Sequence, residues 1–252
     1  MTVQYVSDLH IEFPENRDFL AQNPIKPVGD VLVLAGDIVP FVVMDKYSDF
    51  FKYLSDHFKI TYWIPGNHEY YYSDLSDRYG SIYEKVFDNV FLVNNTAIQH
   101  ENVNFIFSTL WSKISISNQL QIENGMSDFQ VIKINGNRFT SFEYNALHNE
   151  SLLFLEQALL QGNNIKTVVA THHVPTFMNY PSKYENDLLN EAFAVELFSL
   201  IENSGPDFWI YGHSHANSPD FTIGKTQICT NQLGYIKYEE QIGFNTIKTF
   251  NI

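Results

Sequence analysis

Apolar runs along the chain predict a sheet with parallel crossovers. Val3–Ser7, Val31–Ala35 and Ile60–Ile64 are short and mostly apolar, as buried strands are. Between the second and third runs, aromatic and leucine side chains recur at helical spacing over Asp45–Phe58. Strands that alternate with a connection and a helix in this order are typical of parallel α/β units.

The pattern changes in the middle of the chain. Val90–Val93, Ile98–His100 and Val103–Ser108 are short runs joined by tight links, which predicts an antiparallel meander. Residues 112–145 are polar and poorly periodic, so we expect them to form a long excursion over the surface. Helical spacing returns over Leu147–Leu160.

The last third of the chain again predicts strands and helices. Thr167–Ala170 and Phe208–Tyr211 have the character of buried strands, and Ala192–Ile201 that of a helix. The last fifty residues are expected to form strands and turns. No repeat and no linker-like stretch marks a boundary, so we expect one domain over residues 1–252.

Five of the predicted strands are followed at once by side chains that bind metals. In chain order these side chains are Asp8 and His10, Asp37, Asn67, His172, and His213 with His215. The carboxyl ends of parallel strands share one edge of a sheet, so the side chains are expected to converge there. Within each pair two residues apart, extended backbone would project both side chains to the same side.

Glycines at positions 36, 66 and 212 stand directly before three of these residues. Glycine at such a place permits a sharp turn or a close approach of the backbone. We therefore expect tight backbone packing around the candidate ligands.

The candidate ligands comprise two carboxylates, one amide and four imidazoles. Imidazole with carboxylate favours Zn, Fe or Mn over a Ca or Mg site. Seven ligands are too many for one tetrahedral ion and suit two ions about 3.5–4 Å apart that share a carboxylate. Such ions lower the pKa of bound water to about 7, which makes hydroxide available at neutral pH. The predicted cofactors are thus two divalent transition-metal ions, Mn, Fe or Zn.

The acidic composition limits the partners. The chain has 29 acidic and 15 basic side chains, a formal net charge of −14, and no run of Lys or Arg. Such a surface repels phosphate backbones, so non-specific nucleic-acid binding is not expected. No apolar run approaches the roughly 18 residues of a membrane span, so we expect no membrane association.

A cytoplasmic location is the expectation from the remaining features. The first residues contain no basic start followed by an apolar run, as a signal peptide would. The single cysteine, Cys229, cannot form an internal disulfide. The oligomeric state is left open by the sequence.

The motifs in their order resemble the five-block pattern of the calcineurin-like metallophosphoesterases, over nearly the whole chain. They are Asp8-x-His10, Gly36-Asp37, Gly66-Asn67-His68-Glu69, His172 and Gly212-His213-x-His215. The likeness extends to residues 209–215, Ile223-Gly224 and Gly234-Tyr235, which resemble an Icc-like bacterial subgroup of small phosphohydrolases. Residues 231–234 lack the proline that relatives often place before the glycine, which leaves the shape of this loop open.

This resemblance implies a fold and a role for each residue. The fold is of the α/β class, a four-layer α/β/β/α sandwich of two mixed β-sheets with the site at the strand ends. The first metal would be held by Asp8, His10 and His215, the second by Asn67, His172 and His213, and both by Asp37. His68 would face the substrate and protonate the leaving oxygen or stabilise the transition state.

The implied function is hydrolysis of a phosphodiester or a small phosphomonoester by attack of metal-bound hydroxide. A protein phosphatase is the alternative, and a silent interaction scaffold is disfavoured because no ligand position is vacant. We expect specificity to lie in residues 70–76, 112–145 and Phe177–Asp187. Candidates for contact with a small phosphorylated substrate are His173, Tyr180 and Lys183. The alternative for the aromatic side chains of Phe177–Asp187 is ordinary packing, and the alternative for His173 is a structural histidine.

Overall fold

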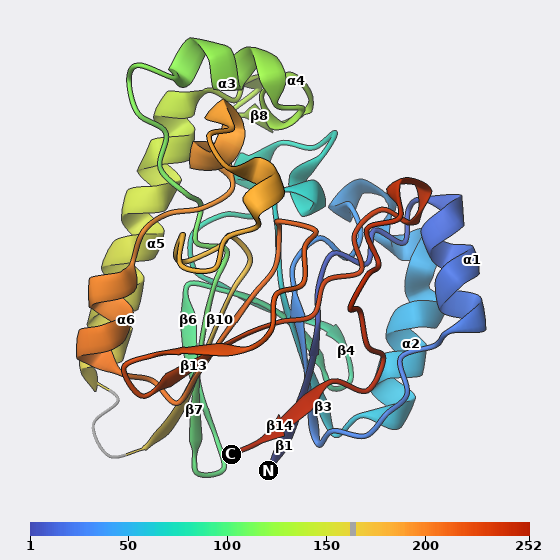
Figure 1. Ribbon diagram of the computed structural model, residues 1–252. Coiled ribbons are helices and arrows are strands. Elements are labelled where there is room, and N and C mark those ends of the chain that lie inside the picture. Colours follow the sequence, from blue (N-terminus) through green and yellow to red (C-terminus); the bar gives the residue numbers. More distant parts are fainter. Residues whose placement is uncertain (162–164) are drawn as a thin grey trace.

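The computed structural model describes residues 1–161 and 165–252, which form two mixed sheets packed face to face between helices (Figure 1). The first sheet has the order β14-β1-β2-β3-β5-β4. Its inner strands are parallel, and β14 and β4 join its edges in antiparallel orientation. The bounds are β1 Thr2–Val6, β2 Val31–Ala35, β3 Ile60–Ile64, β4 Ile82–Phe87, β5 Val90–Asn94 and β14 Thr249–Asn251.

The second sheet repeats this plan, with the order β12-β13-β11-β10-β7-β6. Its inner strands are parallel, and β12 and β6 are antiparallel edges. The bounds are β6 Thr96–His100, β7 Val103–Ser108, β10 Lys166–Thr171, β11 Phe208–Tyr211, β12 Phe221–Ile223 and β13 Thr226–Thr230.

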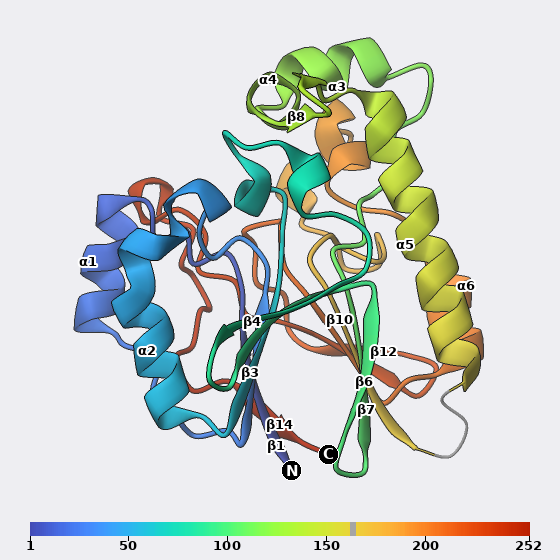
Figure 2. The same cartoon turned by 180° about the vertical axis from the view of Figure 1, so that it is seen from behind.

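Helices cover the outer face of each sheet (Figures 1 and 2). Helices α1 (Pro14–Gln22) and α2 (Ser48–His57) lie on the side of the first sheet, and α5 (Ser141–Gln161) and α6 (Phe198–Ser204) on the side of the second. The expected four-layer α/β/β/α sandwich is thereby confirmed. Above the sheets lie α3 (Gln119–Gly125), α4 (Asp128–Val131) and the hairpin of β8 (Lys133–Ile134) and β9 (Asn137–Arg138). Short 3-10 turns span Phe41–Tyr47, His68–Tyr70, Leu75–Asp77, Ser182–Tyr184, Leu188–Ala192 and Ile236–Tyr238.

Strand β2 shows why its sequence, Val-Leu-Val-Leu-Ala, is apolar throughout. Val31, Val33 and Ala35 pack between the two sheets. Leu32 and Leu34 point the other way, into the core beneath the helices. Because alternate side chains of a strand face opposite sides, a strand that is covered on both faces needs an unbroken apolar run.

The predicted antiparallel meander is confirmed for its second and third runs, which pair as an antiparallel hairpin, and is wrong for the first. Strand β5 pairs with β3 and β4 in the first sheet, whereas β6 and β7 form a hairpin in the second. The link at Asn94-Asn95, where Asn95 has φ 42°, therefore carries the chain from one sheet to the other. Short apolar runs with short links look alike whether the chain stays in one sheet or changes sheet.

Residues 112–140, which we call the cap, are also not the polar excursion that was expected. Their side chains Ile122, Phe129 and Phe139 are completely buried in a separate core cluster, which they share with residues outside the cap such as Trp111 and Tyr144. Each of its short elements contributes only one or two apolar side chains. Because the elements are so short, the apolar positions along the cap show no helical or strand period, and the sequence pattern did not reveal the cap.

Other boundaries also differ from the expectation. Ala192–Ile201 is not one helix, because a 3-10 turn ends at Ala192, Ala194 bridges to Val174, and α6 begins only at Phe198. Helix α5 begins at Ser141, before the expected Leu147, and α1 and β4 were not foreseen. In the described part of the chain, no helix combines the length and apolarity needed to cross a membrane.

Candidate metal centre

The candidate ligands lie at one end of the sandwich, where the carboxyl ends of both sheets meet. Asp8, Asp37 and Asn67 follow β1, β2 and β3 of the first sheet. His172 and His213 follow β10 and β11 of the second. The Asp8 carboxylate accepts the backbone N–H of His213 at 3.0 Å, so it also joins the two sheets.

The first group of side chains consists of Asp8, His10, Asp37 and His215, whose ligand atoms all lie within 4.8 Å of one another. The Nε2 atoms of His10 and His215 are 3.0 Å apart. His215 Nε2 also lies 3.4 Å from Asp8 Oδ1. Nitrogen and oxygen atoms that converge in this way form the kind of site that a divalent ion occupies.

The second group consists of Asp37, His172 and His213. His172 Nε2 lies 3.0 Å from His213 Nδ1 and 3.2 Å from Asn67 Oδ1. Asp37 belongs to both groups, since its Oδ2 lies 3.7 Å from His10 Nε2 and its Oδ1 lies 3.3 Å from His172 Nε2. The two oxygens of one carboxylate thus face two separate clusters.

The carboxylates of the centre favour positive charge on the groups beside them. Burial alone would lower the pKa of His172 and His215, but Asp37 beside the first and Asp8 and Glu240 beside the second raise these pKa values to about 9 and about 10. In contrast, burial and the neighbouring imidazoles His173 and His172 hold the pKa of His213 well below its usual value. The carboxylates therefore attract cations, but the crowded imidazoles cannot all bind protons, and metal ions fit this donor set.

The backbone at the centre is held in an unusual conformation. Five of the seven candidate ligands have positive φ, namely Asp8 (56°), His10 (44°), Asp37 (56°), His213 (74°) and His215 (46°). The idea that each i, i+2 pair projects from extended backbone is therefore wrong, and tight turns aim the side chains instead. For residues other than glycine, the left-handed backbone conformation is strained, and residues that adopt it are concentrated at functional sites.

All three glycines before the ligands permit the expected close approach, and at Gly212 a Cβ would lie 2.7 Å from Asp8 Oδ2. Gly36 has φ 92°, and a Cβ at this position would lie 2.6 Å from Cγ of the His172 ring. A Cβ on Gly66 would lie 2.7 Å from Cε1 and Nε2 of the same ring and would also strike Asp37. Any larger residue at either position would push the second group of ligands apart.

His68 lies outside the two groups that share Asp37, although its ring forms a third cluster of potential ligands with His10 and Glu12. Its ring stacks on Tyr71 with a centroid distance of 3.9 Å, and its Nε2 is 3.1 Å from the hydroxyl of Tyr235. The backbone N–H of His68 donates to Asp37 Oδ1 at 2.9 Å. Although Asn67 and His68 are consecutive, their side chains diverge, one toward His172 and one toward the two tyrosines.

A cavity of about 320 Å³ opens over the centre. Its walls include ligands of both groups together with His68. All three segments in which specificity was expected contribute to it, through Tyr71, residues 125–128 of the cap and Tyr184. Its size is that of a small-molecule site.

The three candidates for substrate contact lie in different surroundings. His173 is completely buried between the rings of Trp111 and His213, and neither it nor Tyr180 is among the residues that line the cavity. Lys183 lines an adjoining hollow, which shares His215 and Glu240 with the cavity. Contact of any of the three with a substrate stays a prediction.

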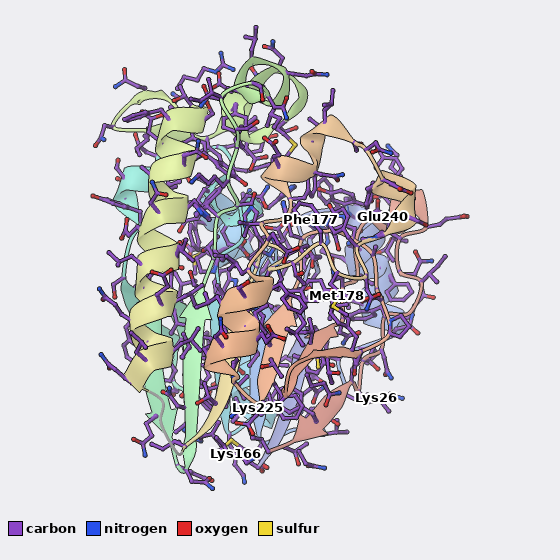
Figure 3. All side chains as sticks on the ribbon, turned by 60° about the vertical axis from the view of Figure 1, so that its left-hand side comes forward. Lys26, Lys166, Phe177, Met178, Lys225 and Glu240 are labelled. Carbon is purple, nitrogen blue, oxygen red and sulfur yellow. The ribbon has the colours of Figure 1, made fainter. Side chains whose placement is uncertain are left out.

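Three acidic residues at the centre were missed. Asp128 of the cap accepts the Tyr71 hydroxyl at 3.1 Å, and Glu240 accepts His215 Nδ1–H at 2.7 Å. Glu240 lies at the end of the molecule opposite Lys166, which begins β10 (Figure 3). Glu12 lies close to His10 and His68. Only Glu12, two residues after His10, had a signal in the sequence, because Asp128 and Glu240 belong to none of the motifs.

Comparisons with known proteins agree with this geometry. The family model for the calcineurin-like phosphoesterases matches residues 1–217. An uncharacterised protein of Acanthamoeba polyphaga mimivirus is 36% identical over 263 residues, which cover 92% of this chain and 91% of that protein. The crystal structure of a phosphopantetheinyl hydrolase from Mycobacterium tuberculosis superposes with a TM-score of 0.72 at 14% identity, covering 99% of this chain and 95% of the other. A dimetal phosphatase from Danio rerio gives a TM-score of 0.53 at 14% identity, with coverage of 92% and 87%.

Proposed function

Since this chain belongs to the calcineurin-like phosphoesterase family and is a metal-dependent hydrolase of phosphate esters, we propose that it cleaves small phosphodiesters with two divalent transition-metal ions. The observation that carries the proposal is Asp37, whose two oxygens face separate clusters of imidazoles. A carboxylate in this position is suited to binding two ions at once.

The proposed ligands follow the two groups. Asp8, His10 and His215 would hold the first ion, Asn67, His172 and His213 would hold the second, and Asp37 would hold both. Two divalent ions bound there, Mn, Fe or Zn, would make water acidic enough to supply hydroxide and would withdraw charge from a phosphate group.

His68 supplies the proton that the leaving group needs. Its Nε2 lies 3.1 Å from the Tyr235 hydroxyl, and both residues line the cavity. Although burial lowers the pKa of His68, the charges of Asp37 and Glu12 outweigh this effect and raise the pKa above its usual value. The raised pKa favours the protonated ring, which can donate a proton to a departing alkoxide.

The charge of the cavity favours diesters over monoesters. Among the described residues that line it, none is Lys or Arg, and Asp128 and Glu240 add negative charge to its walls. A monoester dianion is usually held by a guanidinium or ammonium group, whereas a diester carries only one negative charge. A small phosphomonoester is the second candidate substrate. A protein phosphatase is less well supported, because a cavity of about 320 Å³ suits a small molecule better than a folded partner.

Two assays test the proposal. Elemental analysis after saturation with Mn²⁺ is expected to give two ions per chain, and a strict maximum of one would refute the dinuclear site. With Mn²⁺, kcat/KM for methyl p-nitrophenyl phosphate should exceed that for p-nitrophenyl phosphate, which has the same leaving group, by at least about tenfold. Equal or faster cleavage of the monoester would reverse the diester assignment. The Asp37→Asn protein, purified in parallel, shows whether a contaminating phosphatase contributes.

Three further statements belong to this proposal. We propose that residues 1–252 form one domain, because side chains of both sheets share one core, including Val33 and Phe105. A cytoplasmic location fits a chain whose one cysteine, Cys229, is free and buried. Membership of the Icc-like bacterial subgroup stays a prediction.

A further inference from the structure

The carboxylate of Glu12 lies between two histidine rings that have different tasks. Its Oε1 is 3.5 Å from Nδ1 of His10 and 3.6 Å from Nδ1 of His68. The two rings meet edge to face, with centroids 4.5 Å apart and an interplanar angle of 72°. One of these rings is a proposed metal ligand and the other the proposed proton donor.

The polar atoms of this trio are buried and have no alternative partners. Neither Nδ1 atom, nor either carboxylate oxygen of Glu12, has a hydrogen-bond partner within the described residues. The side chains of His10 and Glu12 are 0% and 15% exposed. Buried polar atoms without partners are costly, and distances of 3.5–3.6 Å are just beyond a hydrogen bond. A shift of a few tenths of an ångström would bring Oε1 within hydrogen-bonding distance of both Nδ1 atoms.

In each ring Nε2, the nitrogen farther from Glu12, points toward the metal centre or the cavity. Nε2 of His10 lies toward His215 and Asp37 in the first group of ligands. Nε2 of His68 lies toward the Tyr235 hydroxyl at the cavity. A carboxylate that accepts Nδ1–H of an imidazole fixes both the tautomer and the rotation of the ring, and so determines what Nε2 can do.

We propose that Glu12 is a positioning residue that holds His10 and His68 at the same time by accepting the Nδ1–H of both rings. His10 then presents a lone pair on Nε2 to the first ion, and His68 presents its Nε2 to the leaving group. One carboxylate thereby sets the distance between the metal ligand and the proton donor. The consequence for catalysis rests on the proposed function, whereas the effect on the rings does not.

The local structure holds Glu12 in place for this task. His10 has φ 44°, which turns the chain sharply before Ile11, and Ile11 is buried. Arg17 Nη1 donates to the carbonyl oxygens of Ile11 at 3.1 Å and Glu12 at 2.9 Å. The backbone on either side of the Glu12 side chain is thus fixed by α1, to which Arg17 belongs.

The test compares Glu12→Gln with Glu15→Gln, which removes the same charge from an exposed position three residues later. In the metal-free parent, nitrogen-15 imidazole spectra recorded at a pH high enough to leave both rings neutral should show Nδ1–H tautomers for His10 and His68, assigned by the loss of each signal in single His→Gln variants. Glu12→Gln should shift both rings toward mixed tautomers, and Glu15→Gln should shift neither. Mn²⁺ titration should show the first ion bound about 10–100-fold more weakly in Glu12→Gln alone.

Kinetics supply the second readout. With matched metal saturation, Glu12→Gln should slow a dialkyl phosphate more than methyl p-nitrophenyl phosphate, because only the alkoxide needs a positioned proton donor. If the parent cleaves neither ester, the proposed function fails, but the spectra and the titration still decide the role of Glu12.

Several results would overturn the proposal. One is unchanged tautomers and unchanged Mn²⁺ affinity in Glu12→Gln. Another is a third Mn²⁺ ion that is bound by the parent and lost in Glu12→Gln, because the two Nδ1 atoms would then be ligands rather than donors. If Glu12→Gln does not fold, Glu12→Asp keeps the charge but shortens the side chain by one methylene, and the same measurements with the same outcomes apply to it.

Discussion

The Asp37 carboxylate differs from that of Asp8 in what it faces. Asp37 has one oxygen toward His10 and one toward His172, whereas Asp8 belongs only to the first group. Asp8 also accepts the backbone N–H of His213, so part of its role is to join the sheets. Asp37 is therefore the proposed bridging ligand of both ions, and Asp8 the proposed ligand of one ion only.

Asp37→Asn should reduce activity more than Asp8→Asn, because loss of the bridging charge weakens both ions. The measurement is kcat/KM on bis-p-nitrophenyl phosphate, together with Mn²⁺ content after gel filtration. Thermal melting of the metal-free proteins controls for the structural part of Asp8. If Asp37→Asn and the parent have comparable activity in matched metal, Asp37 does not bridge.

His68→Ala should separate metal binding from proton donation. Because His68 is outside both ligand groups, the variant should keep its metals. A positioned general acid is typically worth about 10²–10⁴-fold, or about 3–5 kcal/mol of barrier. The loss should be of this size for an alkyl ester and smaller for a nitrophenyl ester, whose leaving group departs without a proton.

The readouts for His68→Ala are metal content and kcat on the two esters. Loss of metal would make His68 a ligand and end this division of roles. Equal slowing of both esters with the metals retained would mean that His68 acts by charge or positioning.

At the scale of elements, one buried carboxylate ties together the two turns that carry Asp37 and Asn67. Glu69 accepts the backbone N–H of Asp37 at 2.9 Å, of Ile38 at 2.7 Å and of Gly66 at 2.6 Å. It also accepts Trp63 Nε1–H at 3.1 Å. The ends of β2 and β3 therefore have a common anchor beneath the metal centre.

Glu69→Gln should destabilise the metal-free protein by about 2–4 kcal/mol. The amide has one acceptor oxygen where the carboxylate has two, and its NH₂ group would face the N–H groups that the second oxygen accepts in the parent. Urea unfolding measures this free energy. Glu156→Gln on the exposed face of α5 is the control and should change it by less than about 0.5 kcal/mol. A similarly small effect for Glu69→Gln would show that the anchor contributes little to stability.

The sequence predicts site residues that stand next to a strand, but not those that distant segments bring to the centre. The ligands of both groups were found because each follows a strand directly, and strand ends in parallel sheets converge. Asp128 and Glu240 could not be found in this way, since each reaches the centre from a segment without a strand–ligand pattern. Their contact with Tyr71 and His215 depends on the folding of the cap and of the C-terminal loop.

The same difference explains the errors in the fold. The β2 run identified a strand that is buried on both faces, and its bounds agree with the structure. The assignment of β5 and β6 to different sheets depends on pairing partners far away in the sequence, which hydrophobic spacing does not encode. The cap was missed because its apolar side chains are distributed over elements too short to show a period.

At the scale of the whole molecule, the candidate metal centre joins the two sheets. The first sheet carries Asp8, His10, Asp37 and Asn67, and the second carries His172, His213 and His215. Both groups of ligands include residues from both sheets. The centre forms only when the sheets are packed together, so metal binding and folding of the whole sandwich are coupled.

Metal binding should therefore raise the melting temperature of the entire protein. An ion at 100 times its Kd stabilises the native state by about 2.7 kcal/mol, and for a chain of this size each kcal/mol corresponds to about 2–4 °C. Mn²⁺ at that excess should raise Tm by about 5–10 °C per site, and EDTA should reverse the change. In Asp37→Asn, the same Mn²⁺ concentration should give a much smaller shift, because both sites lose a ligand. Tryptophan fluorescence gives the decisive comparison, since Trp63 is in the first sheet and Trp209 in the second. Because Trp111 is a third tryptophan, double Trp→Phe variants that keep only Trp63 or only Trp209 separate the two signals. A coupled centre requires both signals to melt at the same raised temperature, whereas a shift confined to one of them would show that the ions stabilise only one sheet.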